Sequence, residues 1–552
     1  MTTILFRGGR VHTAVDPEAT AIAVTDDVIS WIGGEHAIQM AGRPDHIVQL
    51  DGALVTPGFV DAHVHSTDAG LALIGLDLSA ATSLADCLAR IHGAANAIEP
   101  GGLVWGHGWD ETRWPENRPP TRLEIDAAVG DRPTYLSRVD VHSALVSTAL
   151  VAGLADVDIH PDVPPTQAAH HAVRNRAKAL ITPARRESAQ TAFLRAAAAA
   201  GIVEVHECAN GDELGRADLA ALLALENPIS VLGYLAAAVS DPAEAAELLR
   251  ASGAVALAGD LSVDGAIGSR TAALTSPYTD HPTGSGVRYL NDDELADHLW
   301  ACAVAGVQPG FHAIGDDGVS AVGRALRRAA QRLGPNGTVQ LAGVVPRVEH
   351  AEMADAETIA AFAATGTVAS VQPMFDAEWG GDAGMYARRL GADRARGMNP
   401  FAALASAGVA LALGSDAPVT VAQPWRAVQA AVHHRTPGSG LSPRGAFTAH
   451  TRGGHRAAGR TDRGVGTITV GAPAHLAICA AGDLVRPAAN PRVARWSTDP
   501  RSRVPLLPDL SPGVALPTTL ATLVAGRVAF DTGLLADVVG AQVERGPSEL
   551  TR

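Results

Sequence analysis

The stretch Thr56-Pro57-Gly58-Phe59-Val60-Asp61-Ala62-His63-Val64-His65 is an apolar run that ends in two histidines separated by one residue. In a β-strand, the side chains at positions i and i+2 point to the same face. Both imidazole rings can therefore point to one place beyond the strand end, which is how a strand supplies two nitrogen ligands to a metal such as zinc. The pair is weak evidence by itself, because the chain contains 21 histidines.

Length and composition limit what the chain can be. Its 552 residues allow a large barrel with smaller parts, and 47% hydrophobic residues are enough for a sizeable core. We see no apolar run that could span a membrane and no signal peptide at the start. The four scattered cysteines predict a reducing, cytoplasmic location. The net charge of −15 argues against a nucleic-acid or anionic-membrane partner.

Short strand signals occupy both ends of the chain, and each group is too small to bury a core alone. We therefore expect one β-sandwich built from residues 1–56 together with part of residues 441–552, which begin with a helix. The expected strands are Ile4–Arg7, Thr20–Val24, Ile29–Ile32 and Ile47–Leu50, then Thr467–Val470, His475–Ala480 and Leu520–Phe530.

Residues 57–440 alternate between strand and helix signals, which predicts an α/β fold. Asp241-Pro242 and Asn291-Asp292 are typical helix starts. Eight strand–helix units indicate a closed (β/α)8 TIM barrel, with an open parallel sheet as the alternative. The expected strands are Phe59–His65, Ile202–His206, Ile229–Tyr234, Val255–Ala258, Val307–His312, Val344–His350, Thr367–Gln372 and Val409–Leu413.

A large insert, at about residues 70–190, separates the first barrel strand from the second and is too long for a simple crossover. It leaves the barrel directly after the paired histidines, so we expect it over the barrel mouth. Its tryptophans are typical of residues that line an apolar pocket. Trp109 and His142 are candidate substrate-binding residues, and a packed satellite subdomain is the alternative interpretation.

Polar side chains stand where four of the predicted barrel strands end. The carboxyl ends of the strands converge on one site in such a barrel. Each residue is weak evidence alone, but four strands that deliver histidine or aspartate make a strong joint signal. The candidate metal ligands are His63, His65, His312, His350 and Asp416.

Nitrogen and oxygen ligands with an open position suit Zn²⁺, which lowers the pKa of bound water from ~15.7 to about 7. Asp416 suits a general base that takes the water's proton and returns it to a leaving nitrogen. A histidine that does not bind the metal could stabilise the oxyanion, so His350 is a second candidate catalytic residue. Arg270 could clamp a substrate carboxylate or carbonyl, with a surface ion pair as the alternative. Strand alternation predicts that Glu349 points away from the site.

These residues resemble the amidohydrolase superfamily, in the branch of YtcJ-like proteins and N-substituted formamide deformylases. The resemblance rests on the string from Pro57 to His65, on His312, His350 and Asp416 at later strand ends, and on four motifs. They are Trp105-Gly106-His107-Gly108-Trp109-Asp110, Asp264-Gly265-Ala266-Ile267-Gly268-Ser269-Arg270-Thr271, His312-Ala313-Ile314-Gly315-Asp316 and Gly414-Ser415-Asp416-Ala417-Pro418-Val419.

The resemblance implies a (β/α)8 barrel with a composite β-sandwich and a metal-dependent hydrolase of carbon–nitrogen bonds other than peptide bonds. It maps the family's ligands onto the five residues given above. It also implies a small-molecule substrate and a homodimer.

The chain departs from the family pattern at the fourth strand, where binuclear members carry a carbamylated lysine. Asp260 stands at that position, and Lys178, the only lysine in the chain, is expected at the surface. Three interpretations remain open. Asp260 could supply a bridging carboxylate, Glu207 or Cys208 could substitute, or the site could hold a single metal. We favour one Zn²⁺ over two.

The sequence therefore predicts hydrolysis of an amide, N-substituted formamide or similar bond. A deaminase of a cyclic amidine is one alternative, although mononuclear deaminases typically carry a glutamate three residues after the fifth-strand histidine, where this chain has Gly315. A non-catalytic binding protein on the same barrel is the other alternative. The sequence does not identify the substrate.

Overall fold

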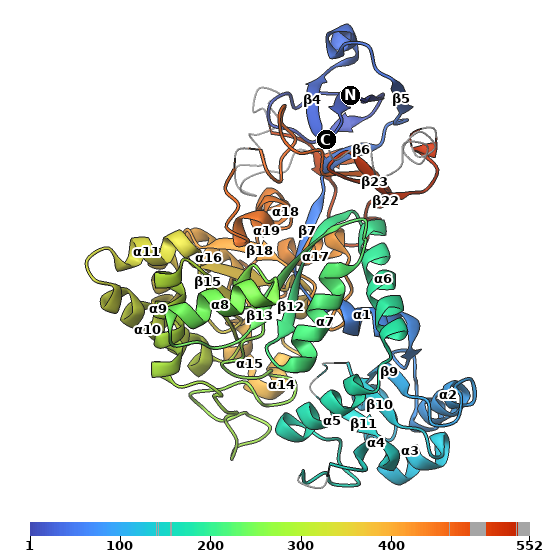
Figure 1. Ribbon diagram of the computed structural model, residues 1–552, viewed down its shortest axis with the longest axis vertical. Coiled ribbons are helices and arrows are strands. Elements are labelled where there is room, and N and C mark those ends of the chain that lie inside the picture. The colour runs from blue at the N-terminus through green and yellow to red at the C-terminus, as the bar shows by residue number, and fades with distance from the viewer. Residues whose placement is uncertain are drawn as a thin grey trace.

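The computed structural model describes residues 1–139, 141, 143–154, 157–462, 464–485, 504–536 and 538. Its central part is a sheet of eight parallel strands that follow one another in chain order (Figure 1). All eight lie at the predicted positions. They are β7 (Phe59–Val64), β12 (Ile202–Asn210), β13 (Ser230–Ala236), β14 (Ala256–Leu257), β15 (Gln308–Ala313), β16 (Arg347–His350), β17 (Val368–Val371) and β18 (Ala410–Leu413).

The sheet closes on itself between its first and last strands. The amide of Asp416 donates to the carbonyl oxygen of His63 at 2.8 Å, and the amide of His65 donates to the carbonyl oxygen of Ala417 at 3.0 Å. A parallel bridge joins Val64 to Ala417. The prediction of a closed barrel is therefore confirmed, and the alternative of an open parallel sheet is excluded.

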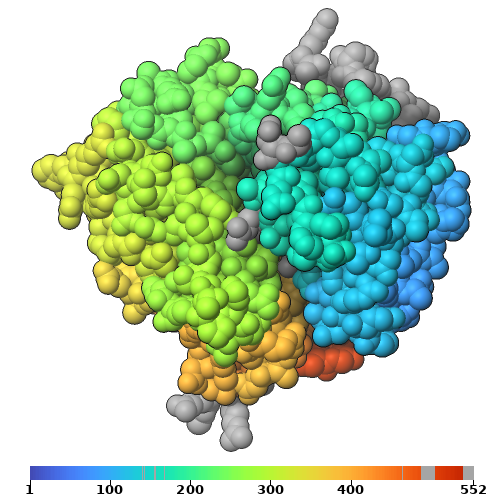
Figure 2. Space-filling model, turned by 90° about the horizontal axis from the view of Figure 1, so that it is seen from below, coloured from blue at the N-terminus to red at the C-terminus, as the bar shows by residue number. Residues whose placement is uncertain are grey.

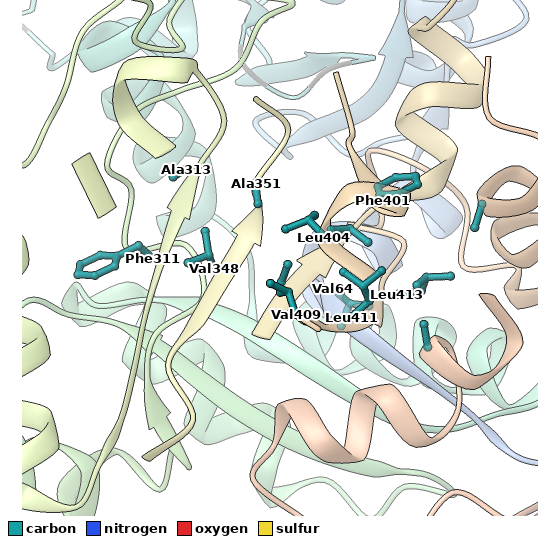
Figure 3. Close-up of a cluster of buried hydrophobic side chains, with 14 of the residues drawn as sticks. Val64, Phe311, Ala313, Val348, Ala351, Phe401, Leu404, Val409, Leu411 and Leu413 are labelled. Atoms are coloured by element: carbon teal, nitrogen blue, oxygen red, sulfur yellow. The ribbon is translucent and has the colours of Figure 1, made fainter. Parts of the chain in front are cut away.

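Helices cover the outside of the barrel and bury the outward faces of the strands. Asp241 and Asn291 cap α8 and α9, as their sequence predicts. Figure 3 shows part of this core, in which Val348 of β16 and Leu413 of β18 lie with Leu404 of α16. The helices between the later strands are α7 (Glu213–Ala224), α8 (Pro242–Ser252), α9 (Asp292–Ala305), α10 (Asp316–Leu333), α11 (Gly337–Val344), α12 (Ala356–Thr365), α13 (Pro373–Trp379), α14 (Met385–Leu390), α15 (Ala392–Arg396) and α16 (Phe401–Ser406).

Three helices follow the last barrel strand, namely α17 (Pro424–Val432), α18 (Pro443–Ala449) and α19 (Arg452–Ala457). Within the described ranges, we find no helix with the length and apolar character needed to cross a membrane.

Two further sheets pack above the barrel and share one apolar core, and strands from both chain ends build the second sheet (Figure 1). In that sheet β6 pairs with β19, where Pro57 lies opposite Leu476. The first sheet contains β1 (Thr3–Arg7), β3 (Ala21–Thr25), β4 (Val28–Gly33) and β5 (His46–Gln49). The second contains β2 (Arg10–Val11), β6 (Leu54–Pro57), β19 (Leu476–Ala480), β22 (Thr518–Val524) and β23 (Arg527–Asp531).

Two of the expected strands differ in the structure. The segment Thr467–Val470 is not a strand, because its backbone is held by turn bonds from Thr467 to Gly464 and from Ala472 to Thr469. The segment Leu520–Phe530 is two strands rather than one. It folds into the β22–β23 hairpin at Ala525 and Gly526, whose φ angles of 47° and 73° suit a tight hairpin turn.

The insert forms its own four-stranded sheet and lies beside the barrel (Figures 1 and 2). Helix α1 leads into it from β7, and α6 returns the chain to β12. The elements are α1 (Ser66–Ile74), β8 (Leu76–Asp77), α2 (Leu84–Asn96), β9 (Val104–Trp109), α3 (Arg122–Val129), β10 (Thr134–Arg138), β11 (Ala144–Val146), α4 (Thr148–Val151), α5 (Gln167–Ala179) and α6 (Pro183–Ala199).

Candidate metal centre

Four side chains from three barrel strand ends meet at the mouth of the barrel. His63 Nε2 lies 3.4 Å from Asp260 Oδ1 and 3.5 Å from Asp416 Oδ1. His65 Nε2 lies 3.1 Å from Asp260 Oδ2 and 3.3 Å from Asp416 Oδ1. His63 lies in β7 and His65 comes directly after it, whereas Asp260 follows β14 and Asp416 follows β18. The structure therefore places Asp260, from the fourth strand, beside the predicted histidine pair.

The remaining two predicted ligands lie next to this group. The ring centroid of His350 is 5.0 Å from that of His63 and 4.6 Å from that of His312. His350 Nδ1 lies 2.8 Å from Gln372 Oε1. Because an amide oxygen can only accept, Gln372 fixes the proton on Nδ1 and leaves Nε2 of His350 available. All five predicted residues are thus brought together at one end of the barrel.

The donor atoms at this point fit a divalent cation. His63 Nε2 and Asp260 Oδ1 are buried and make no hydrogen bond within the described residues, which is unusual for buried polar atoms. Burial lowers the pKa of His65, but the charges of Asp260 and Asp416 outweigh burial and raise it to about 10. The site therefore strongly favours positive charge where the imidazole nitrogens and the two carboxylates converge.

Backbone conformation at the strand ends aims these side chains. His350 and Asp416 have positive φ angles of 67° and 54°, which non-glycine residues seldom adopt and which cluster at functional sites. Asp61 accepts a hydrogen bond from the Ser415 amide at 2.8 Å and so fixes the loop that carries Asp416. Burial raises the pKa of Asp61 to about 6 despite the hydrogen bonds it accepts.

Glu349 contacts the site, so the expectation that it points away was wrong. Its Oε2 lies 2.9 Å from His63 Nδ1. The rule of alternation assumes a regular strand, whereas the chain turns at His350 through a positive φ. Burial raises the pKa of Glu349, but the Arg347 charge and the bond with His63 outweigh it and lower the pKa to about 2. Glu349 is therefore an ionised carboxylate in direct contact with His63.

Asp264 holds together the loops next to His312, whose Nδ1 lies 3.8 Å from Asp264 Oδ1. Its fully buried carboxylate accepts hydrogen bonds from the amides of Ala273, Ile314 and Gly315 at 2.8–2.9 Å. These bonds tie the loop after β14 to the loop after β15. Burial raises the pKa of Asp264 to about 7 even with these donors. The conformation of the chain beyond His312 is thus set by one carboxylate.

A polar cavity adjoins the cluster, between the barrel and α5 of the insert. His65, Glu207, Cys208 and Asp260 contribute barrel walls, and Arg174 and Lys178 contribute the insert wall. Asp68 pairs with both cations, and Lys178 Nζ lies 3.1 Å from its Oδ1. The expectation that Lys178 lies at the surface was therefore wrong, because its side chain is 20% exposed and lines this cavity. The insert reaches the barrel mouth through this contact.

Neither Trp109 nor Arg270, two of the predicted substrate-binding residues, lines the cavity described above. Trp109 packs in the core of the insert, and its indole N–H donates to Leu136 O at 2.8 Å. Arg270 pairs with Asp280 at 2.8 Å. His142 lies outside the described residues.

Sequence reasoning missed the orienting residues Asp61, Glu349 and Gln372. Their signal was a polar or charged residue inside or directly after a buried strand, because such a group stays buried only when it has a partner. The partner itself comes from another strand, which the sequence alone does not reveal.

A model of the amidohydrolase family matches residues 46–530. Two solved structures share the fold, and both are described as uncharacterized metal-dependent hydrolases. The one from Pyrococcus horikoshii OT3 has a TM-score of 0.68 at 22% identity and covers 86% of this chain and 97% of its own. The one from Pyrococcus furiosus has a TM-score of 0.67 at 24% identity and covers 86% and 98%.

Two curated relatives are similar in sequence. The protein named "Putative amidohydrolase YtcJ" of Bacillus subtilis (strain 168) is 26% identical over 460 residues, which is 78% of this chain and 83% of that protein. The N-substituted formamide deformylase of Arthrobacter pascens is 30% identical over 149 residues, which is 26% of this chain and 27% of that protein. The family match spans the barrel and its cluster of histidines and aspartates, so the chain belongs to the amidohydrolase family and is a hydrolase of carbon–nitrogen bonds.

Proposed function

We propose that this protein hydrolyses a non-peptide carbon–nitrogen bond in a small polar amide or N-substituted formamide, with Asp416 as the proton shuttle and with zinc as the metal. The observation that supports it most directly is the convergence of His63 Nε2 and His65 Nε2 on the carboxylates of Asp260 and Asp416 within 3.1–3.5 Å. Imidazole nitrogen and carboxylate oxygen are the donors that zinc takes in catalytic sites.

The residues that would hold the metal are His63, His65, Asp260 and Asp416, with His312 and His350 beside them. When bound there, the metal would lower the pKa of a water molecule and polarise the substrate oxygen. We favour a single ion, because both carboxylates approach the same histidine pair. Asp260 thus takes the place of the lysine that binuclear members use.

Asp416 is the proposed general base. It comes from the strand opposite Asp260 in the closed barrel and lies within reach of both histidines of β7. Its carboxylate can take a proton from the attacking water and deliver it to the leaving nitrogen, which turns a poor amide leaving group into a neutral amine. General acid–base catalysis of this kind contributes typically 10²–10⁴-fold to the rate.

His350 is proposed to donate a hydrogen bond to the substrate oxygen or to complete the ligand set. Its ring is held between Gln372 and the Phe375 ring, which stacks on it at 5.9 Å. A ring fixed in this way loses little freedom when it binds the developing oxyanion, which is what makes such donors effective.

The relatives and the lining of the cavity support the proposed substrate class. The deformylase relative acts, by its name, on N-substituted formamides. Side chains around the cavity are mostly charged, including Asp68, Arg174 and Lys178, so a polar substrate fits better than a hydrocarbon-rich one. A deaminase is less well supported, because Gly315 offers no acid where deaminases carry glutamate.

The experiment compares Asp416→Asn with the matched control Asp355→Asn, which changes the cap of α12 to another good capping residue. Purified proteins are supplied with zinc and assayed for amine release from a panel of N-substituted formamides and amides. We expect Asp416→Asn to lower kcat by about 10²–10⁴-fold even when the rate is expressed per bound zinc, and the control to match wild type. Full activity of Asp416→Asn would exclude the shuttle role.

Metal analysis of the same samples separates the remaining alternatives. A zinc stoichiometry near one supports the single-ion proposal, and a value near two refutes it. A value near zero in zinc-supplemented preparations favours a non-catalytic protein. Release of ammonia rather than an amine and an acid would favour the deaminase.

A further inference from the structure

The interior of this barrel contains a layer of charge directly beneath the metal centre. Barrel interiors of this fold are usually filled by branched aliphatic side chains. Here Arg347 and Glu349 of β16 lie fully buried inside the barrel, together with His206 and Glu204 of β12. Burying charges is strongly unfavourable unless each one is paired and hydrogen-bonded. Each charge in this layer must therefore have a buried partner.

Every guanidinium nitrogen of Arg347 has a hydrogen-bond partner. Its Nε donates to Glu349 Oε1 at 2.6 Å and its Nη2 donates to Glu349 Oε2 at 3.0 Å, which makes a two-pronged pair. Nη2 also donates to the carbonyl oxygen of Ala62 and to Ser370 Oγ. The guanidinium lies 4.3 Å from the centre of the Tyr234 ring. Three neighbouring elements thus hold the cation in one orientation.

Glu349 passes this orientation to a metal-site residue. Both of its oxygens accept from Arg347, and its Oε2 also lies 2.9 Å from His63 Nδ1. A carboxylate held by a guanidinium can only accept a hydrogen bond, so His63 carries its proton on Nδ1. Nε2 is then left as a lone pair that faces Asp260 and Asp416.

The network continues away from the metal centre. Arg347 Nη1 donates to His206 Nδ1 at 2.8 Å, and His206 Nε2 lies 3.4 Å from Glu204 Oε1. Glu204 Oε2 accepts from Arg460 at 2.6 Å. Each donor direction is fixed, because an arginine can only donate and a carboxylate can only accept. Within the part of the chain that the structure describes, Glu204 is therefore linked to Arg347 only through the ring of His206.

We propose that Arg347 and Glu349 are positioning residues of the metal site, which set the tautomer and orientation of His63 so that Nε2 is presented to the cation. This inference rests on the proposed metal centre. A carboxylate that accepts from the second nitrogen of a ligating histidine raises the basicity of the ligand. The buried arginine keeps that carboxylate in place without a bond to solvent.

The test measures metal affinity rather than turnover. Wild type, Glu349→Gln and Arg347→Lys are titrated with Zn²⁺ against a chromogenic chelator, and with Co²⁺ while the visible absorption of the bound ion is recorded. Glu349→Gln keeps the shape but loses the charge and allows the wrong tautomer. We expect its Zn²⁺ affinity to fall about 10–100-fold, with a changed Co²⁺ spectrum.

Glu204→Gln is the matched control, because it makes the same chemical change at the far end of the same buried network. Arg347 keeps its bonds to Glu349, Ala62 and Ser370 in this variant, so we expect a lower Tm but Zn²⁺ affinity within about twofold of wild type. A purely structural role would lower Tm in both glutamate variants and leave both affinities unchanged.

The outcomes separate this inference from the proposal on which it rests. Absence of Zn²⁺ and Co²⁺ binding by wild type refutes the metal centre itself. Binding by wild type and equally tight binding by folded Glu349→Gln, with the same Co²⁺ spectrum, refutes the positioning role. If Glu349→Gln does not fold, Arg347→Lys decides, because lysine keeps the charge but cannot hold both oxygens of Glu349, and an unchanged affinity there overturns the inference.

Discussion

The amide of Asp416 donates to the carbonyl oxygen of His63 at 2.8 Å, and this bond is part of the seam at which the barrel closes. The same two residues supply side chains to the candidate metal centre, 3.5 Å apart at Nε2 and Oδ1. The bond that closes the barrel therefore also places the His63 and Asp416 side chains next to each other. A change that opens the seam by a fraction of an ångström separates the proposed base from the proposed ligand.

Gly414→Ala is expected to damage catalysis through this seam. A Cβ atom at position 414 would lie 2.7 Å from the His63 amide nitrogen, so the main chain of one strand must move. A misplacement of about 1 Å can cost about 100-fold in rate, and we expect a fall in kcat of that order. Gly343→Ala on α11 is the control, since nothing lies within 4 Å of its added methyl. Steady-state kinetics that show equal rates for both variants would contradict the seam argument.

Asp61→Ala is expected to lower both stability and rate. It removes the acceptor of the buried Ser415 amide, and leaving such a donor unsatisfied costs about 1–3 kcal/mol. Urea unfolding measures the loss. Asp355→Ala, which removes the cap of α12, should cost a comparable 0.5–2 kcal/mol without a change in kcat. The prediction fails if the two variants lose activity to the same extent.

Asp68→Asn is expected to loosen the insert from the barrel. Asp68 is almost fully buried and pairs with both Arg174 and Lys178 of α5. Removing one partner of a buried pair costs about 3–5 kcal/mol, which chemical denaturation can measure. Hydrogen exchange should rise in α5 before it rises in the barrel strands. The exposed pair Arg118–Glu124 is the comparison, and Glu124→Gln should change stability by less than about 1 kcal/mol.

The Asp68 contact also predicts a dependence on pH. Burial raises the pKa of Asp68, but the charges of Arg174 and Lys178 outweigh burial and bring it below its ordinary value. The folded state thus binds this proton less tightly than the unfolded state, so the contribution is complete above about pH 4 and is lost as pH falls below it. The Tm difference between wild type and Asp68→Asn should therefore shrink from pH 6 to pH 3. A difference that grows over this range would show the opposite sign.

Metal removal is expected to abolish activity and to lower stability. A ligand that binds only the folded protein adds about 2.7 kcal/mol at 100 times its Kd. Dialysis against a chelator should therefore lower Tm, and Zn²⁺ should restore both Tm and rate. Parallel reloading with Mn²⁺ and Co²⁺ tests the choice of metal. Recovery of activity with Mn²⁺ but not with Zn²⁺ would overturn the assignment of zinc.

The barrel could be predicted because its strands are short apolar runs that alternate with amphipathic helices, and because four of their ends are marked by histidine or aspartate. Even β14, with only Ala256 and Leu257 in the ladder, is located by the strands on either side of it. The position of Asp260 at the site follows from the same order of strands.

Other features could not be predicted because they depend on contacts between distant segments. Glu349 reaches His63 because the chain turns at His350, which strand alternation does not include. Lys178 is drawn into the barrel mouth and only 20% exposed because it pairs with Asp68, more than a hundred residues earlier in the chain. Thr467–Val470 has the composition of a strand, yet turn bonds take its backbone groups before a partner strand can.

Only Gly58 separates β6 from β7, so the strand that carries the histidine pair is a direct continuation of the upper sheet. That sheet is completed by β19, β22 and β23 from the other end of the chain. The C-terminal strands thus anchor the start of β7, the strand that carries the candidate ligand His63. A truncation that deletes β22 and β23 should abolish activity although every residue of the barrel strands remains. The C-terminal strands are therefore required for activity even though they lie far from the site in sequence.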